Sequence, residues 1–339
     1  MLRRGVLVLS VVAASSSPGA SPVTAADRPA GGLLLVANKG EHTLGIIDPA
    51  LGKQVAVIEE SGVTGHEVIA SPDGRTAYVP IYGNSGVGRA GTDGRTMDVI
   101  DIASRKRVAT VDFGRPERPH CAQFGPDGRL YVTTELTSTI TVIDPKTNAI
   151  VERIPTGQPE SHMLALTRDG TRAYTSNVHV GTVSAIDIKA RKVVAVIPVS
   201  SLAQRIALSV DDKWVFTADQ KEARLAVIDT AANAVKQWVS LPSIAYGTAP
   251  TPDGRWLLVT IIGNDKLGVV DLQSMQLART IDVPAAPQEV VVRPDGLVAY
   301  VSCDASRKVA AIDLKEWKVE RLIDAGAAAD GLAWAPSRP

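Results

Sequence analysis

Seven residues that can form hydrogen bonds recur at one place in a repeat of this 339-residue sequence. Each lies eight residues before the glycine position of a repeated turn, and from the second residue onwards the spacing is 42. None of the seven is aliphatic, so a ring built from them would be polar throughout and suited to holding a ligand. The residues are His66, His120, His162, Gln204, Tyr246, Gln288 and Asp330.

Histidine dominates the chemistry that this set allows. Three of the five histidines belong to it, and the other two, His42 and His179, lie in loops expected on the same face. Neutral imidazoles bind Zn, Cu, Ni or Fe, and three of them can leave a position open for water or substrate. The sequence therefore predicts a transition-metal site at the histidines of the set, His66, His120 and His162.

Two other roles for these histidines stay open. A histidine can transfer protons near neutral pH, with Tyr246 or a carboxylate as its partner. The candidate carboxylates are Glu67, Glu135 and Glu160, although loop positions favour solvated side chains for them. Each ring histidine can instead be structural, bonded to the backbone of the next repeat.

An internal repeat predicts the elements that position these residues. Each copy has a turn, usually containing Asp-Gly, that favours a β-hairpin because it needs a positive φ. The copies are SPDGRTAYV (71–79), GPDGRLYV (125–132), TRDGTRAYT (167–175), SVDDKWVFT (209–217), TPDGRWLLV (251–259) and RPDGLVAYV (293–301), with a truncated APSRP at 335–339. A second marker is an aspartate that closes an apolar run, at Asp48, Asp101, Asp144, Asp187, Asp229, Asp271 and Asp313.

Each repeat reads as four short strands rich in Val, Ile, Thr and Ala, and repeats of this length are typical of β-propellers. The sequence predicts an all-β, seven-bladed propeller with four-stranded antiparallel blades, forming one domain over residues 30–339. Second-strand sequence follows residue 30 and first-strand sequence ends the chain, so the two termini should complete one blade and close the ring. The longest insertion, residues 82–95, is either a lid over the ring of seven residues or a mobile surface loop.

The segments AYVP, LYVTTE, AYTSN and AYVSC, each followed by a VID-like run, resemble the YVTN family of β-propeller repeat proteins. The resemblance covers roughly residues 30–339. It implies the propeller fold strongly and the function weakly, because such propellers look like lactonase-type enzymes, surface-layer modules, nucleic-acid binders or periplasmic companions of dehydrogenases.

The composition and the N-terminal sequence indicate which partners and which cellular location to expect. Lys plus Arg equals Asp plus Glu at 36 each, which argues against a nucleic-acid partner. Residues 1–26 read as a signal peptide, with Arg3 and Arg4 before a short apolar run, and no later segment is apolar enough to span a membrane. A periplasmic or secreted monomer is expected, exported by the general or the twin-arginine route.

Cys121 and Cys303 fall in different repeats and should be free, buried thiols. The predicted function is binding of a small ligand or transition metal at the mouth of the channel, in an accessory or carrier role or beside another periplasmic protein. The alternatives are a lactonase, hydrolase or lyase that uses the same histidines, and a protein-interaction scaffold.

Overall fold

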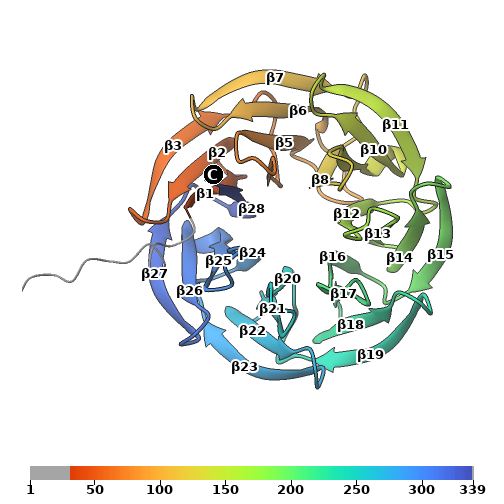
Figure 1. Ribbon diagram of the computed structural model, residues 1–339, viewed down its shortest axis with the longest axis vertical. Helices are drawn as coiled ribbons and strands as arrows, with labels where there is room; N and C mark the ends of the chain where they lie inside the picture. The colour runs from red at the N-terminus through yellow and green to blue at the C-terminus, as the bar shows by residue number, and fades with distance from the viewer. Residues whose placement is uncertain (1–30, 338–339) are drawn as a thin grey trace, which may run out of the picture.

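The computed structural model describes residues 31–337 as a ring of seven four-stranded antiparallel sheets. In Figure 1, which looks down the ring axis, the innermost strand of each sheet faces the central channel. The prediction of an all-β, seven-bladed propeller is confirmed. Helical structure among these residues consists of two short 3-10 turns, η2 (Glu135–Thr137) and η3 (Asp304–Ser306), and no helix in this range is long and apolar enough to cross a membrane.

Each blade is numbered from its place in the ring and read from its inner to its outer strand. Blade 1 contains β28 (Ala329–Pro336), β1 (Gly32–Asn38), β2 (Thr43–Asp48) and β3 (Lys53–Glu59), and blade 2 contains β4 (Ile69–Ala70), β5 (Thr76–Gly83), β6 (Asp93–Asp101) and β7 (Lys106–Asp112). Blade 3 contains β8 (Pro119–Phe124), β9 (Leu130–Thr134), β10 (Thr139–Asp144) and β11 (Ala149–Pro155), and blade 4 contains β12 (Ser161–Leu166), β13 (Arg172–Asn177), β14 (Thr182–Asp187) and β15 (Lys192–Pro198). Blade 5 contains β16 (Ala203–Leu208), β17 (Trp214–Asp219), β18 (Arg224–Asp229) and β19 (Ala234–Ser240). Blade 6 contains β20 (Thr248–Pro250), β21 (Trp256–Ile261), β22 (Lys266–Asp271) and β23 (Gln276–Asp282). Blade 7 contains β24 (Pro287–Val292), β25 (Val298–Cys303), β26 (Lys308–Asp313) and β27 (Lys318–Asp324).

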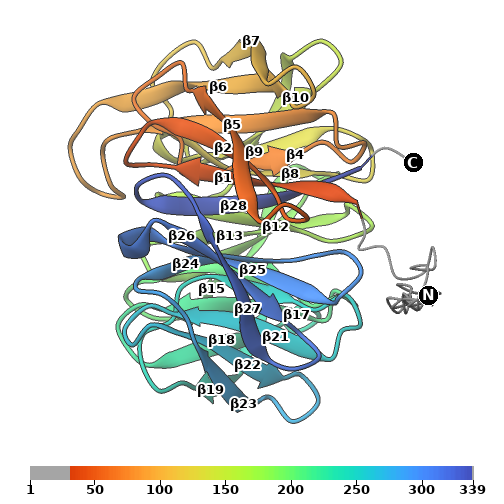
Figure 2. The same ribbon diagram turned by 90° about the vertical axis from the view of Figure 1, so that its left-hand side faces the viewer.

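The ring closes within blade 1, as expected. Strand β28 pairs antiparallel with β1, so that Leu34 lies opposite Trp334 and Val36 opposite Leu332. Figure 2 shows these two strands side by side although they come from opposite ends of the chain. Pairing the first and last strands leaves no unpaired strand edge at the junction.

Local turn chemistry explains why the repeats fold as hairpins. Gly74, in the first Pro-Asp-Gly turn, has a φ of 67°, and the preceding Asp73 accepts a hydrogen bond from the backbone N–H of Arg75. The aspartates that end the third strands also accept backbone N–H bonds from the following turn. They are Asp48, Asp101, Asp144, Asp187, Asp229, Asp271 and Asp313.

The core lies between neighbouring blades, because each sheet is covered on both faces. Four successive residues of β1, Leu34 to Ala37, are fully buried, as radial sheets require. The ring of Trp256 packs edge-on against Trp317 of the next blade, with 5.4 Å between ring centroids. Both cysteines are free and buried, as predicted. The predicted signal peptide, residues 1–26, lies outside the described residues.

Candidate functional site

The seven ring residues occupy equivalent places at the start of the inner strands. Five are the second residue of their strand and two lie just before it. In blade order from blade 2 they are His66 (before β4), His120 (β8), His162 (β12), Gln204 (β16), Tyr246 (before β20), Gln288 (β24) and Asp330 (β28). The 42-residue spacing therefore corresponds to one residue per blade at one end of the channel.

A repeated backbone irregularity aims these side chains away from the blade surfaces. In five blades the pairing of the inner strand shifts at this position, as between Pro119 and Ala122 in β8. In four blades the residue two positions earlier has a positive φ, as at Arg118 and Glu160. A β-bulge re-aims side chains, so in these five blades the side chains at the bulge depart from the regular alternation of the strand.

Three of the five histidines come together around a tyrosine that the sequence analysis missed. Tyr82, at the end of β5, has its ring centroid 4.7, 5.1 and 5.6 Å from those of His66, His120 and His162. The rings of His120 and His162 lie nearly face to face, with centroids 3.6 Å apart and planes inclined by 31°. These four side chains form what we call the histidine cluster.

The other two histidines lie outside this cluster. His42, in the turn between β1 and β2, is exposed. His179 has 52% of its side chain exposed and pairs through Nδ1 with Glu160 at 2.7 Å. Of the five histidines expected on one face, three therefore form a cluster, and the other two are exposed and lie apart from it.

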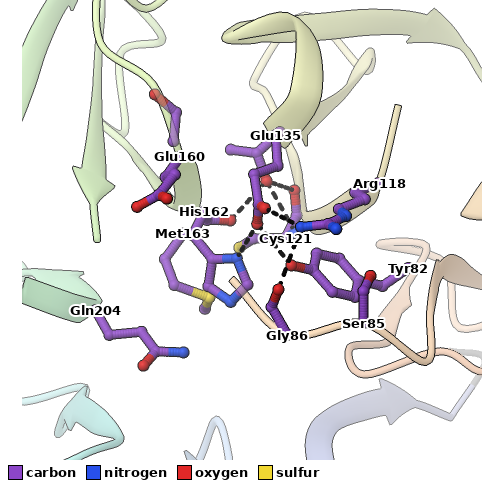
Figure 3. A network of polar contacts seen from close by, with 12 residues as sticks. Tyr82, Ser85, Gly86, Arg118, Cys121, Glu135, Glu160, His162, Met163 and Gln204 are labelled. Carbon is purple, nitrogen blue, oxygen red and sulfur yellow. Dashed lines mark hydrogen bonds and ion pairs between the residues drawn. The ribbon is translucent and has the colours of Figure 1, made fainter. Parts of the chain in front are cut away.

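Glu135 anchors one side of the cluster from the turn η2, and Figure 3 shows its contacts. Its carboxylate accepts hydrogen bonds from the Tyr82 hydroxyl at 2.8 Å and from Arg118 Nη1 at 2.9 Å, and lies 2.9 Å from His162 Nδ1. Burial alone would raise the pKa of Glu135, but the bonds from His162, Tyr82 and Arg118 hold it below the usual value. Glu135 is therefore an ionised carboxylate that orients the His162 ring.

Sequence reasoning placed Glu67 and Glu135 on solvated loops, and this was wrong. They are 8% and 3% exposed, respectively, because bonds from arginines compensate their burial. Glu160 is only half-buried and bonds His179.

The histidines on the other side of the cluster are held neutral. Burial lowers the pKa of His66 to about 4, partly opposed by the charge of Asp330. Burial and neighbouring positive groups lower the pKa of His120 well below its usual value. Nδ1 of His120 is buried, and no described residue offers it a hydrogen-bond partner. An unpaired buried nitrogen of this kind is costly and is uncommon in folded proteins.

The insertion at 82–95 is held in place over this end of the channel. Arg118 donates to Asp93 at 2.7 Å and to the backbone carbonyls of Gly86 and Arg89 at 3.2 and 2.7 Å. A Cβ placed on Gly88 would lie 3.0 Å from Glu160, so the insertion of blade 2 extends past blade 3 to blade 4. We call residues 82–95 the covering loop.

A second ring of residues, one position further along each inner strand, closes the channel below the histidine cluster. Its centre is Arg205, only 3% exposed, which donates to Glu67 at 2.6 Å, to Asp330 at 3.0 Å and to Glu289. The Arg205 guanidinium also lies 4.7 Å from the centroid of the Tyr246 ring. Because these partners come from four other blades, Arg205 blocks the channel.

We call Arg205 and the side chains that it contacts, those of Glu67, Tyr246, Glu289 and Asp330, the Arg205 plug. Sequence reasoning missed this plug, although the spacing of the ring residues carried a signal for it. The residues following the seven ring positions recur every 42 residues from the second one onwards, and they include one arginine and two glutamates. They are Glu67, Cys121, Met163, Arg205, Gly247, Glu289 and Gly331. Gly331 leaves room for the plug, since a Cβ there would lie 2.8 Å from a carboxylate oxygen of Glu67.

Of the remaining ring residues, Tyr246 and Asp330 contact Arg205 directly. Gln204 Nε2 donates to the Tyr246 hydroxyl at 3.1 Å, and Lys39 bonds Asp330 at 2.9 Å. Gln288 is 7% exposed and donates to the carbonyl of Ala286. The ring thus divides into an aromatic histidine half and a second polar half, in which Tyr246 and Asp330 contact Arg205.

The histidine cluster does not present a ready metal site. Within residues 31–337 no three His, Cys, Asp or Glu side chains are grouped as metal ligands. The planes of the His120 and His162 rings are inclined by 31°, and Glu135 occupies Nδ1 of His162. Metal binding at His66, His120 and His162 stays a prediction.

The fold and this ring define a seven-bladed propeller with polar chemistry concentrated at one end of its channel. Residues 149–333 match the family described as "Lactonase, 7-bladed beta-propeller". The match covers more than half of the sequence, and the chain belongs to this family. No curated protein matches the sequence.

Solved structures with a similar fold include "Kuenenia stuttgartiensis Hydrazine Synthase", with a TM-score of 0.73 and 21% identity over 84% of this chain and 93% of that one. A functionally unknown protein from Desulfotomaculum acetoxidans DSM 771 has a TM-score of 0.75 and 13% identity, covering 91% of this chain and 100% of its own. "Dihydro-heme d1 dehydrogenase NirN in complex with DHE" has a TM-score of 0.63 and 15% identity, covering 92% and 79%. At these identities the likeness concerns the fold alone.

Proposed function

We propose that this protein binds a small, polar organic molecule at the histidine cluster, beneath the covering loop. The observation that carries the proposal is Nδ1 of His120, which is buried without a partner at the end of the channel. A bound hydroxyl or carbonyl group would satisfy it, removing a cost of about 1–3 kcal/mol.

The charge state of the cluster limits the class of ligand. His66 and His120 are neutral at pH 7, because burial lowers both pKa values. Neutral imidazoles donate one hydrogen bond and accept another, which suits hydroxyl and carbonyl groups. A neutral oxygen-rich molecule, such as a lactone or a sugar derivative, fits this chemistry.

Lactone hydrolysis is the second candidate, and the pairing of His162 with Glu135 favours it. In the neutral tautomer of His162 whose Nδ1 proton is accepted by the ionised Glu135, Nε2 is unprotonated and can act as a base. Such a base would take a proton from water as the water oxygen attacks the lactone carbonyl. The ester C–O bond then breaks, the same proton passes to the leaving alkoxide oxygen, and the product is a hydroxy acid.

Saturation-transfer NMR with glucono-δ-lactone and γ-butyrolactone tests both candidates, with product formation followed in the same samples. His120→Leu should weaken binding at least about tenfold, since it removes the unpaired nitrogen. The matched control is His42→Asn, an exposed histidine outside the cluster, which should leave binding unchanged. Turnover that His162→Gln abolishes while binding persists would identify an enzyme.

Absence of both binding and turnover across the panel would contradict the lactone class. Metal analysis of protein purified without a histidine tag tests the transition-metal prediction, with loss of metal expected in a His66→Ala, His120→Ala double variant. Neither ligand nor metal would favour the scaffold alternative. Export is proposed as well, and N-terminal sequencing of the mature protein should then begin near Asp27.

A further inference from the structure

A separate cavity of about 420 Å³ lies in the channel on the other side of the Arg205 plug. Its inner end is lined by Glu67 and Glu289, and it extends to Arg168 and Asp212 in turns at the opposite end of the channel. Its volume falls in the range of about 300–1,000 Å³ that small-molecule sites occupy. Since Arg205 bonds residues of other blades across the channel, this cavity is distinct from the histidine cluster.

The walls of the cavity are mainly apolar. They are formed by the inner strands, with Val68, Leu164, Leu208 and Ala249 among the lining side chains. A ligand that fills this space must therefore carry an apolar body.

The inner end of the cavity holds more carboxyl groups than cations. Arg205 Nη1 donates to Oε1 of Glu67 and to Oε2 of Glu289, and these side chains keep 10% and 16% of their surface exposed. Three carboxylates, those of Glu67, Glu289 and Asp330, face two cations, Arg205 and Lys39. Lys39 is also shared with Asp304 at 3.6 Å, so the plug has at least one carboxyl group more than it has cations.

The protonation behaviour of Glu67 agrees with this imbalance. Burial raises its pKa to about 8 although Arg205 opposes the shift, and the charge of Glu289 adds to it. At pH 7 a proton therefore compensates the third carboxyl group of the plug, and a bound cation can replace that proton.

We propose that this cavity binds a small organic cation, an alkyl- or arylalkylammonium ion, with its ammonium group at Glu67 and Glu289 and its apolar body against the channel walls. The ammonium group takes the place of the proton on the third carboxyl group and supplies hydrogen-bond donors for the carboxylate oxygens. Each methylene buried against the walls should improve the affinity about fourfold.

Isothermal titration with n-butyl-, n-pentyl- and n-hexylammonium chloride at pH 7.5 tests the proposal, with 1-hexanol as the uncharged probe. Hexylammonium should bind at one site per chain, at least about tenfold more tightly than 1-hexanol, and affinity should rise along the series. Glu289→Gln should weaken hexylammonium binding at least about tenfold and leave 1-hexanol unaffected.

Ala249→Leu adds volume to the wall and should abolish binding of both probes, which keeps the test decisive if Glu289→Gln does not fold. The matched control is His120→Leu at the histidine cluster, which should leave hexylammonium binding unchanged. The proposal is overturned if hexylammonium gives no saturable heat, binds no better than 1-hexanol, or binds undiminished in the Ala249→Leu variant. Because the control separates the two sites, failure here leaves the proposed lactone binding intact.

Discussion

The pKa of His66 provides a direct test of how the histidine cluster is built. Burial lowers it from 6.5 to about 4, a shift that corresponds to about 3.4 kcal/mol against the protonated form. At pH 5 only about one tenth of His66 should be protonated in the native protein, compared with nearly all of it in the unfolded chain.

The sign of the stability effect follows from this difference. Between pH 6.5 and pH 4 the unfolded chain binds more protons at His66 than the native protein does, so this residue makes stability fall as the pH falls. By pH 5 the loss from His66 amounts to about 2 kcal/mol. The raised pKa of Glu67 changes stability with pH in the opposite direction. Glu67 is present both in the wild type and in a His66 variant, so its contribution cancels when the two proteins are compared.

His66→Gln removes the titrating group while keeping a polar side chain of similar reach. The free energy of unfolding lost through the substitution should be about 2 kcal/mol smaller at pH 5 than at pH 7. Guanidinium unfolding followed by tryptophan fluorescence measures this difference, and NMR of the imidazole Cε1–H signals measures the pKa itself. An equal cost at both pH values, together with a His66 signal that titrates near 6.5, would refute the reasoning.

Three further predictions concern the plug, the covering loop and the thiols. Since burial raises the pKa of Glu67, this residue should lower the free energy of unfolding of the wild type by roughly 3 kcal/mol between pH 5 and pH 8. The Glu67→Gln variant should lack that loss, and the same pH dependence in both proteins would contradict the prediction. Arg118→Ala releases the carbonyl of Arg89, so trypsin should cut there at least about tenfold faster than in wild type, and an unchanged rate would show that other contacts hold the loop. Cys121 and Cys303, both buried with a pKa of about 12, should react with a disulfide reagent only on unfolding, and rapid native labelling would contradict their burial.

The fold could be predicted from the sequence because its determinants are local. The turn aspartates and glycines, such as Asp73 and Gly74, specify a hairpin from a few neighbouring residues. The 42-residue period then repeats that hairpin and brings the ring positions to one end of the channel. Even the closing pair of β1 and β28 was predictable, because the two ends of the sequence supply complementary parts of one repeat.

The site was predictable only as a set of positions. That His66, His120 and His162 lie at one end of the channel follows from their place in the repeat. The length of the covering loop could be read from the sequence, but its attachment through Arg118 could not, because Arg118 lies in the next repeat and bonds two backbone carbonyls.

The sequence by itself therefore determined a closed ring of seven blades and the order of polar residues around its channel. Only the tertiary structure decided which of those residues meet and which charges they carry. Arg205 contacts Glu67 and Asp330 across 138 and 125 residues of chain, and no local pattern encodes such a pairing. Burial depends on the completed ring, and burial is what keeps His66 neutral and makes Glu67 part of a plug.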